Sequence, residues 1–102
     1  MQDQIAILNE MVNIILNEVN DPFETIYFKG ELDIGDEFFD GNLAYYFQGI
    51  RYSIGMSFTS AVRISDLSFD LHKAMSEHTG GKWKWFTLEL DQNGQAKTHF
   101  EY

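Results

Sequence analysis

Apolar residues near the start of the chain recur at the spacing of an α-helix. They fall on one side of the expected helix, at Ile5, Leu8, Val12, Ile15, Leu16 and Val19. Polar residues such as Asn13 and Asn17 lie largely on the other side. The stretch Asn20-Asp21-Pro22 ends the pattern, because proline disfavours helical backbone in the preceding residue and has no amide to donate. The pattern therefore predicts an N-terminal amphipathic helix.

The period then changes from helical spacing to alternation, which is typical of a half-buried strand. The apolar side of this strand holds Ile26, Phe28 and Leu32. Its other side carries Thr25, Tyr27, Lys29 and Glu31. We expect the strand to end near Ile34-Gly35-Asp36, where glycine and aspartate favour a turn.

A second strand is expected in the aromatic region that follows. Phe38-Phe39 comes first, then Asp40-Gly41-Asn42, which indicates a second turn or a bulge, and then the aromatic run of residues 43–47. Gln48-Gly49 predicts a hairpin turn. Beyond it a third strand is expected from a clean alternation of apolar residues, at Ile50, Tyr52, Ile54, Met56 and Phe58.

The last part of the chain predicts a second helix and a hairpin. Ser65 is a good N-cap for the helix, and Thr79-Gly80-Gly81 ends it. One face of this helix is apolar or aromatic, at Leu67, Leu71, Ala74, Met75 and His78. Residues 83–90 then alternate strongly, Asn93-Gly94 forms a turn that accepts positive φ, and residues 95–102 return as the last strand.

These elements predict one α+β domain over residues 1–102. It has an N-terminal helix, a three-strand meander, a second helix and a C-terminal hairpin. The sheet of about five strands is largely antiparallel and is covered on one face by the helices. The chain is long enough for a single self-supporting core, and 44% of its residues are hydrophobic.

Charge and cysteine content narrow the function. Sixteen Asp and Glu face seven Lys and Arg, a formal charge of −9, which reflects solubility demands or a partner of opposite sign. The few cations are scattered, so direct nucleic-acid binding and an anionic membrane surface are disfavoured. The chain has no cysteine, which fits a reducing compartment. Its first residues lack the pattern of a secretory signal, so we expect a cytoplasmic protein.

Residues that could carry catalysis form no recognisable constellation. His72 and His78 lie on opposite-leaning faces of the expected helix, so they cannot hold one metal as an i, i+4 pair does. His99 in the last strand favours an ordinary cross-strand role. The serines lack a nucleophile-elbow context, and the carboxylates of residues 33–40 lack the regular ligand spacing of a calcium loop. We therefore expect no enzymatic activity, no cofactor and no metal.

The acidic cluster is the best indication of function. Five carboxylates crowd into one short aromatic stretch, at Glu31, Asp33, Asp36, Glu37 and Asp40. The apolar side chains beside them are Phe38, Phe39 and Tyr45. An apolar anchor ringed by charge gives both affinity and fast, electrostatically steered association. We therefore predict that these residues bind a partner protein.

The strand of residues 83–90 carries apolar bulk on both faces. One face holds Phe86, Leu88 and Leu90, and the other holds Trp83, Trp85, Thr87 and Glu89. Helices must cover one of these faces. The other is either an aromatic ladder across strands or a second interaction patch.

The stretch from Trp85 to Gly94, WFTLELDQNG, and the terminal Phe100-Glu101-Tyr102 resemble the C-terminal hairpin of the YezG-like immunity proteins. That family accompanies bacterial polymorphic and contact-dependent growth inhibition toxins. The order of elements is also similar, with an N-terminal helix and a helix before the Trp strand. An aromatic strand pair around Ile26-Tyr27-Phe28 and Tyr45-Tyr46-Phe47 completes the resemblance, which spans most of the chain.

The resemblance implies a cytoplasmic antidote without catalysis, which binds a cognate toxin domain, commonly a nuclease, and blocks its active site or substrate path. A nuclease active site is basic because it holds phosphates, so an acidic inhibitor is steered into it. The free protein is expected to be a monomer or a weak homodimer. Two alternatives remain open: a small intracellular ligand-binding or homodimeric domain, and an enzyme that uses a carboxylate pair beside His99.

Overall fold

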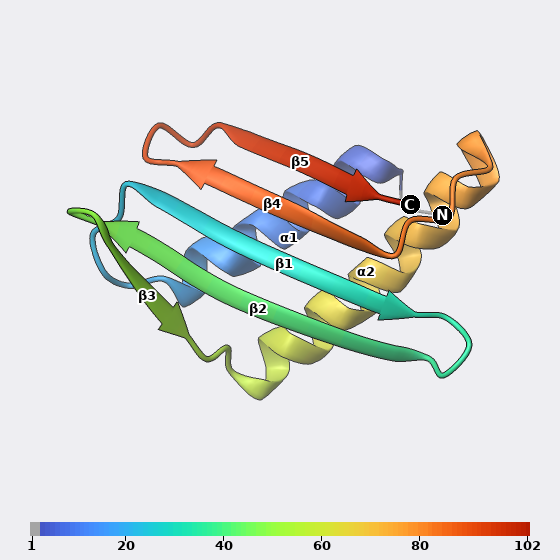
Figure 1. The fold of residues 1–102 in the computed structure, drawn as a ribbon, viewed down its shortest axis with the longest axis horizontal. Helices are drawn as coiled ribbons and strands as arrows, with labels where there is room; N and C mark the ends of the chain where they lie inside the picture. Colours follow the sequence, from blue (N-terminus) through green and yellow to red (C-terminus); the bar gives the residue numbers. More distant parts are fainter. Residues whose placement is uncertain (1–2) are drawn as a thin grey trace.

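The computed structural model describes residues 3–102, which form two helices and one five-stranded antiparallel sheet (Figure 1). The elements along the chain are α1 (Gln4–Glu18), β1 (Thr25–Asp33), β2 (Phe38–Phe47), β3 (Ile50–Ile54), α2 (Phe58–Thr79), β4 (Trp85–Asp91) and β5 (Ala96–Glu101). The strand order is β3-β2-β1-β4-β5. The predicted α+β fold, with a meander, a second helix and a C-terminal hairpin, is confirmed.

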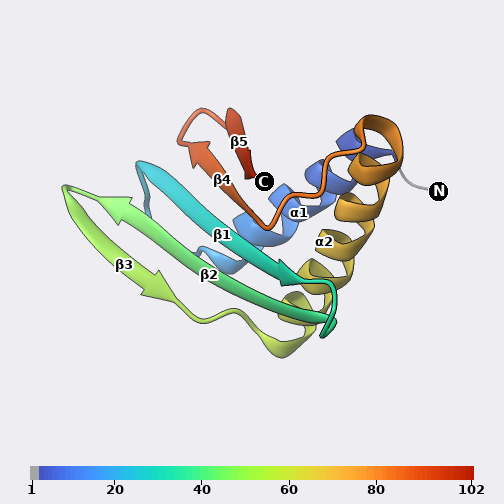
Figure 2. The ribbon, with the colours of Figure 1, turned by 45° about the vertical axis from the view of Figure 1, so that its right-hand side comes forward.

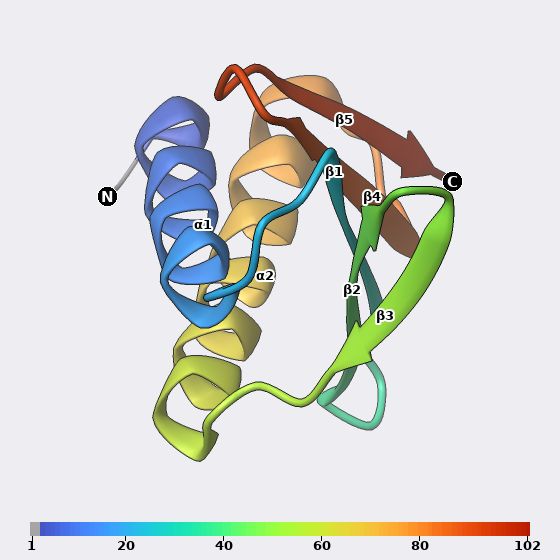
Figure 3. The ribbon, with the colours of Figure 1, turned by 90° about the vertical axis from the view of Figure 1, so that its left-hand side faces the viewer.

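The molecule has two layers. Figure 3 shows both helices on one face of the sheet, while the other face is open. The helices are antiparallel neighbours, because Ser57 at the start of α2 donates its hydroxyl to Glu18 at the end of α1, 2.8 Å away. Among residues 3–102, no helix combines the length and the apolarity that a membrane span needs.

The core fills the space between the helices and the inner face of the sheet. Its most deeply buried side chains are each no more than 1% exposed, among them Ile7, Met11, Ile15, Ile26, Phe28, Ile64, Leu67, Leu71, Phe86, Leu88 and Leu90. The strand members lie at alternate positions of β1 and β4, as the period of two predicts. Each of these burials stabilises the fold by about 1.5–3 kcal/mol relative to an exposed side chain.

The buried face of α1 differs from the predicted one. Ile5 is 71% exposed and Leu16 is 37% exposed, although both were assigned to the core side. The side chains that face the core are Ile7, Met11, Ile15 and Val19. The helix carries apolar residues around much of its circumference, so two stripes of i, i+4 spacing compete. Packing against α2 and the sheet selects one of them, which the periodicity of an isolated segment does not reveal.

The start of α2 was placed eight residues too late, and β3 was predicted too long. The N-cap is Ser57, whose hydroxyl accepts from the amide of Ser60 at 3.3 Å, rather than Ser65. The helix begins at Phe58, which is 83% exposed, and β3 ends at Ile54. The alternation of apolar residues thus continues for four residues past the end of β3. The chain enters the helix there because the Ser57 cap outweighs the alternation locally.

The predicted turns are confirmed where glycine provides the backbone freedom. Gln48 and Gly49 have φ of 52° and 77°, the two positive values of a two-residue hairpin turn between β2 and β3. Gly80, with φ of 71°, ends α2 in the left-handed conformation. Gly94 has φ of 83° in the turn between β4 and β5.

His78 in the last turn of α2 is exposed, although it was assigned to the packing face.

The second turn or bulge predicted at Asp40-Gly41-Asn42 is absent from β2, which runs without interruption from Phe38 to Phe47. Gly41 pairs with Gly30 of β1. A Cβ on Gly41 would lie 2.9 Å from the ring of Phe39, and a Cβ on Gly30 would lie 2.6 Å from the ring of Phe86. These glycines therefore make room for core aromatic rings, which pack over the backbone where side chains would stand.

We expect Gly30→Ala to lower the free energy of unfolding by about 1–3 kcal/mol, because the added methyl overpacks the core. It would stand 2.6 Å from a ring atom of Phe86 and 2.9 Å from one of Phe39, both held among buried neighbours. Gly55→Ala is the matched control, since no atom lies within 4 Å of its Cβ position. Urea unfolding of both variants measures the difference. An equal effect at the two positions would contradict the close packing at Gly30.

Candidate functional site

A groove of about 1230 Å³ lies between the end of the β1–β2 hairpin and α2. Its walls come from three segments that are distant in the sequence: residues 31–40, residues 69–77 of α2, and residues 82–85 before and at the start of β4. Figure 2 shows how this end of the hairpin extends past the start of β4 toward α2. The groove is therefore a product of the tertiary fold.

The register of the strands explains why the hairpin projects. β4 begins at Trp85, which is opposite Glu31, whereas β1 and β2 continue to pair as far as Asp33 and Phe38. Next to this pairing, the amide of Leu32 in β1 donates a hydrogen bond to the carbonyl of Lys84, the residue just before β4, at 2.9 Å. Beyond it the hairpin has no neighbour on that edge, and its end is open to solvent and to the groove.

Trp83 and His72 form the floor of the groove. Trp83 was assigned to the same strand face as Trp85, yet it precedes β4 and is only 1% exposed. Its ring centroid lies 5.2 Å from that of Phe86, 5.5 Å from that of Phe100 and 5.0 Å from that of His72. The assignment failed because strand alternation applies only inside the strand, and Trp83 stands two residues before it.

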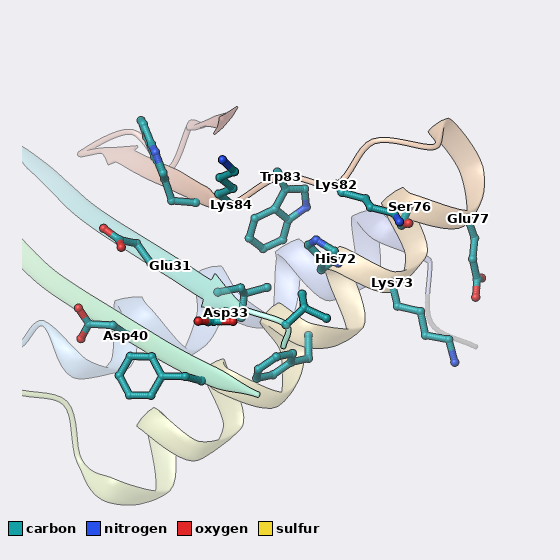
Figure 4. Close-up of a pocket in the computed structure, with 15 residues that line it drawn as sticks. Glu31, Asp33, Asp40, His72, Lys73, Ser76, Glu77, Lys82, Trp83 and Lys84 are labelled. Atoms are coloured by element: carbon teal, nitrogen blue, oxygen red, sulfur yellow. The ribbon is translucent and has the colours of Figure 1, made fainter. Parts of the chain in front are cut away.

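The edge of Trp83 that carries nitrogen faces His72 (Figure 4). The indole nitrogen is buried and has no hydrogen-bond partner among the described residues. The two rings meet nearly edge to face, at an angle of 65°. An edge-to-face contact of two aromatic rings is a favourable arrangement that adds to the apolar burial. The His72–Trp83 contact therefore joins α2 to the segment before β4.

The two sides of the groove carry opposite charges. Glu31, Asp33 and Asp40 come from the hairpin. Lys73, Lys82 and Lys84 come from α2 and the segment before β4, together with one carboxylate, that of Glu77 (Figure 4). None of these three lysines forms an ion pair with a residue in the described range 3–102. Glu31 pairs with Lys29 at 3.3 Å, and the same ammonium lies 4.6 Å from the ring centroid of Trp85. The groove is thus a polarised surface with an aromatic floor.

Six of the eight predicted partner-binding residues gather at this end of the molecule. We call them the hairpin end, namely Glu31, Asp33, Asp36, Glu37, Phe38 and Asp40. Glu31 is directly opposite Asp40 in the β1–β2 ladder, and Asp33 is opposite Phe38. Phe38 is 60% exposed, and Ile34 beside it is 50% exposed. Carboxylates and apolar side chains therefore share one exposed surface.

Two of the predicted residues are not on this surface. Phe39 faces the helices, because neighbours in a strand point to opposite sides, and its ring stacks on that of Phe28 at 6.4 Å. Tyr45 is only 8% exposed, near the other end of β2, where its hydroxyl donates to Asp21 at 3.0 Å. Neither side chain is placed to serve as an exposed anchor beside the carboxylates, so we correct both assignments.

The turn at the tip of the hairpin is held by its own hydrogen bonds. The amide of Asp36 donates to the carboxylate of Asp33 at 3.2 Å, and the amide of Glu37 donates to the carbonyl of Ile34 at 3.4 Å. Glu37 has φ of 54°, a left-handed conformation that is uncommon outside glycine, asparagine and aspartate. The tip thus has a defined conformation before any partner binds.

Sequence reasoning missed the side of the groove opposite the hairpin. Its members are Phe69, His72, Lys73, Lys82, Trp83 and Lys84. The only signal was the aromatic and lysine content of residues 82–85, and nothing local places these beside α2. His99, which was considered for catalysis, lies outside the groove and contacts Glu101 at 2.9 Å. Among the described residues, no three His, Asp or Glu side chains come close enough to hold a metal ion.

Burial lowers the pKa of His72 below its ordinary value of 6.5, and the nearby Lys82 ammonium acts in the same direction, against a hydrogen bond with the Trp83 backbone. The unfolded chain therefore takes up this proton at a higher pH than the folded chain. The contribution of neutral His72 to the free energy of unfolding is fully present above about pH 6.5 and falls as the pH drops toward the lowered pKa.

We expect His72→Gln, which cannot become charged, to weaken this pH dependence. The loss of unfolding free energy between about pH 7.5 and about pH 5.5 should be smaller in the variant than in the unaltered chain. Urea unfolding at both pH values measures it, and the carboxylates that titrate in this range are common to both proteins. Equal losses would show that His72 is not the group responsible.

Comparison of the sequence with protein-family models gave no match, and a search of curated proteins gave none either.

Proposed function

We propose that this chain is a non-catalytic, cytoplasmic immunity protein that neutralises a bacterial toxin domain by binding it with the hairpin end. The observation that carries the proposal is the exposed, projecting cluster of carboxylates around Phe38. The resemblance of the last strands to the YezG-like immunity proteins supplies the class of partner. A nuclease toxin with a basic active site is the partner that this chemistry fits best.

The arrangement of charges supports a partner of opposite sign. Like charges directly opposite in neighbouring strands destabilise a sheet, and Glu31 and Asp40 are such a pair. Lys29 compensates Glu31 only in part, because both members of that ion pair are exposed. A partner that places lysine or arginine side chains against the hairpin end relieves this repulsion. The repulsion between Glu31 and Asp40 therefore destabilises the free protein and is relieved when the partner binds.

Shape and preorganisation support the same mode of inhibition. The hairpin end projects beyond β4, so it fits a concave active site better than it fits a flat partner surface. Its turn is already ordered by the bonds to Asp33 and Ile34, which reduces the entropy lost on binding. Phe38 and Ile34 offer apolar contact area among the carboxylates. The hairpin end would thus fill the toxin's substrate path with acidic groups in place of phosphates.

The groove favours a second candidate function, the binding of a small molecule. An aromatic floor with three lysines at its rim, none of them ion-paired within residues 3–102, fits an anionic amphiphilic ligand. Native mass spectrometry of the purified chain separates the two candidates. A stoichiometric bound mass favours the ligand-binding function, whereas the bare chain favours the immunity function.

The proposal is tested by capture of the partner. The tagged chain is used to retain proteins from its source cells at low and at high salt, and the retained proteins are identified and assayed for nuclease activity. A basic nuclease domain in a one-to-one complex, retained less well at high salt and inhibited by added chain, is the expected result. Retention of no other protein, or of one whose activity the chain leaves unchanged, would refute the proposal.

A further inference from the structure

The edge strand β3 has fewer of the features that protect an exposed edge than β5 has. Its five residues, Ile50–Ile54, contain one charged side chain and no proline. The opposite edge, β5, carries Lys97, His99 and Glu101. Natural sheets use charges, prolines or bulges to keep their edges from pairing, so an edge with a single charged residue and no proline is open to pairing. The two edges of this sheet therefore differ in their capacity for self-association.

The charge of the chain also points to β3. None of the sixteen carboxylates lies between Gly41 and Ser65, the segment that builds most of β2, all of β3 and the start of α2. Two copies with a charge of −9 each repel one another over most of their surfaces. The repulsion is lower where both present β3, which has no carboxylate of its own. Three carboxylates from outside the segment, those of Glu18, Asp21 and Glu24, accept hydrogen bonds from residues within it. A second copy is thus the occupant that the charge distribution favours at this edge.

Figure 3 shows β3 at the edge of the sheet, and several apolar side chains at and near this edge are exposed. Ile50 is 54% exposed and Tyr52 is 39% exposed, although they pair with the core-facing positions of β2. The ring of Tyr52 stacks on that of Tyr45 at 4.9 Å, which fixes its position. Phe58, at the start of α2, is 83% exposed. An added strand would extend this apolar side of the sheet.

The backbone geometry defines the register of such a pairing. In a two-residue hairpin the residues that flank the turn, here Phe47 and Ile50, form a hydrogen-bonded pair. The backbone groups of Ile50, Tyr52 and Ile54 therefore point to β2, and those of Arg51 and Ser53 point to the open edge. An antiparallel pairing centred on Tyr52 places Arg51 of each copy opposite Ser53 of the other, so both residues use their free backbone groups.

The side chains fit the same register. Arg51 already donates from Nη1 to the hydroxyl of its own Ser53 at 2.8 Å, so an arginine beside a serine is a compatible pair on this face. On the other face Ile50 of one copy would meet Ile54 of the second. β3 itself contributes no carboxylate to the contact. We infer that two copies of this chain associate through antiparallel pairing of their β3 strands, which joins their sheets into one.

The dimer leaves the hairpin end free. Figure 1 shows the β1–β2 turn and the β2–β3 turn at opposite ends of the sheet. Each copy would therefore present its own hairpin end, and a dimer would hold two partner molecules. The contact is smaller than a standard protein interface, so the association is expected to be weak, with a dissociation constant of about 10–100 µM.

Sedimentation velocity of the full chain from about 5 µM to about 500 µM tests the inference. The sedimentation coefficient of the unaltered chain should rise from that of the monomer toward that of a dimer. Ser53→Pro removes one outward amide without affecting the ladder to β2, and it should sediment as a monomer throughout. Ser53→Thr keeps the amide and should behave as the unaltered chain does.

Tyr52→Lys provides a second, independent variant, because it places two ammonium groups face to face at the centre of the contact. It should raise the dissociation constant at least about tenfold. Circular dichroism confirms that each variant is folded. A monomer at every concentration of the unaltered chain, or dimers that persist in both folded variants, would overturn the inference. Capture of the partner protein by the monomeric Ser53→Pro variant tests the proposed function independently of dimer formation.

Discussion

Reversing three charges at the hairpin end, with Asp36→Lys, Glu37→Lys and Asp40→Lys together, is expected to slow association with the toxin about 10- to 100-fold at low salt. These side chains are exposed, and Asp36 and Glu37 lie at the tip that would meet the partner first. Their attraction acts before contact, so the association rate should change more than the dissociation rate. The measurement is binding kinetics at several salt concentrations, and the difference should shrink as salt rises.

A matched variant separates local attraction from net charge. Asp66→Lys, Asp70→Lys and Glu89→Lys together change the charge by the same amount, and all three side chains are exposed and outside the hairpin end. This control should associate at a rate within about threefold of the unaltered chain. Equal slowing by the two triple variants would mean that only total charge matters. Unchanged association of a folded hairpin variant would move the interface elsewhere.

Trp83→Ala should produce the largest loss of stability, about 3–5 kcal/mol of the free energy of unfolding. Trp83 is 1% exposed and contacts three aromatic rings that come from α2, β4 and β5. Its removal leaves a cavity where these elements meet the segment before β4. Because small domains are stable by only about 5–15 kcal/mol, this variant should be close to unfolding.

Trp85→Ala is the control for this prediction, since Trp85 is half-buried on the open face of the sheet. It contacts the Lys29 ammonium at 4.6 Å and the ring of His99 at 5.9 Å. Its loss should cost about 1 kcal/mol or less. Urea unfolding measures both variants. Similar costs for the two tryptophans would contradict the assignment of Trp83 to the core and of Trp85 to the open face.

Several parts of the fold that depend on local pattern were predicted correctly. Strand alternation identified Ile26 and Phe28 as core residues, and the Gln48-Gly49 turn followed from glycine's freedom at positive φ. The error on α1 arose where a tertiary contact decided between local options. Ile5 and Ile7 are equally plausible on a helix that is apolar on two sides, and only the packing against α2 and the sheet buries Ile7.

The candidate site divides in the same way. The hairpin end was predictable because its carboxylates are neighbours in the sequence and a hairpin keeps them together. The opposite side of the groove was not, because Lys73 and Lys82 meet Asp33 only through the docking of α2 beside the hairpin. Phe39 was assigned to the surface from its sequence neighbours, whereas strand alternation alone would have placed its side chain on the other face of the sheet from that of Phe38.

Titration of the captured toxin's nuclease activity with three forms of this chain tests the central claim most directly. The unaltered chain and the Asp66, Asp70 and Glu89 variant should abolish activity at about one equivalent, while the hairpin variant should need at least about tenfold more. Equally effective inhibition by the hairpin variant would contradict the claim that the hairpin end blocks the toxin.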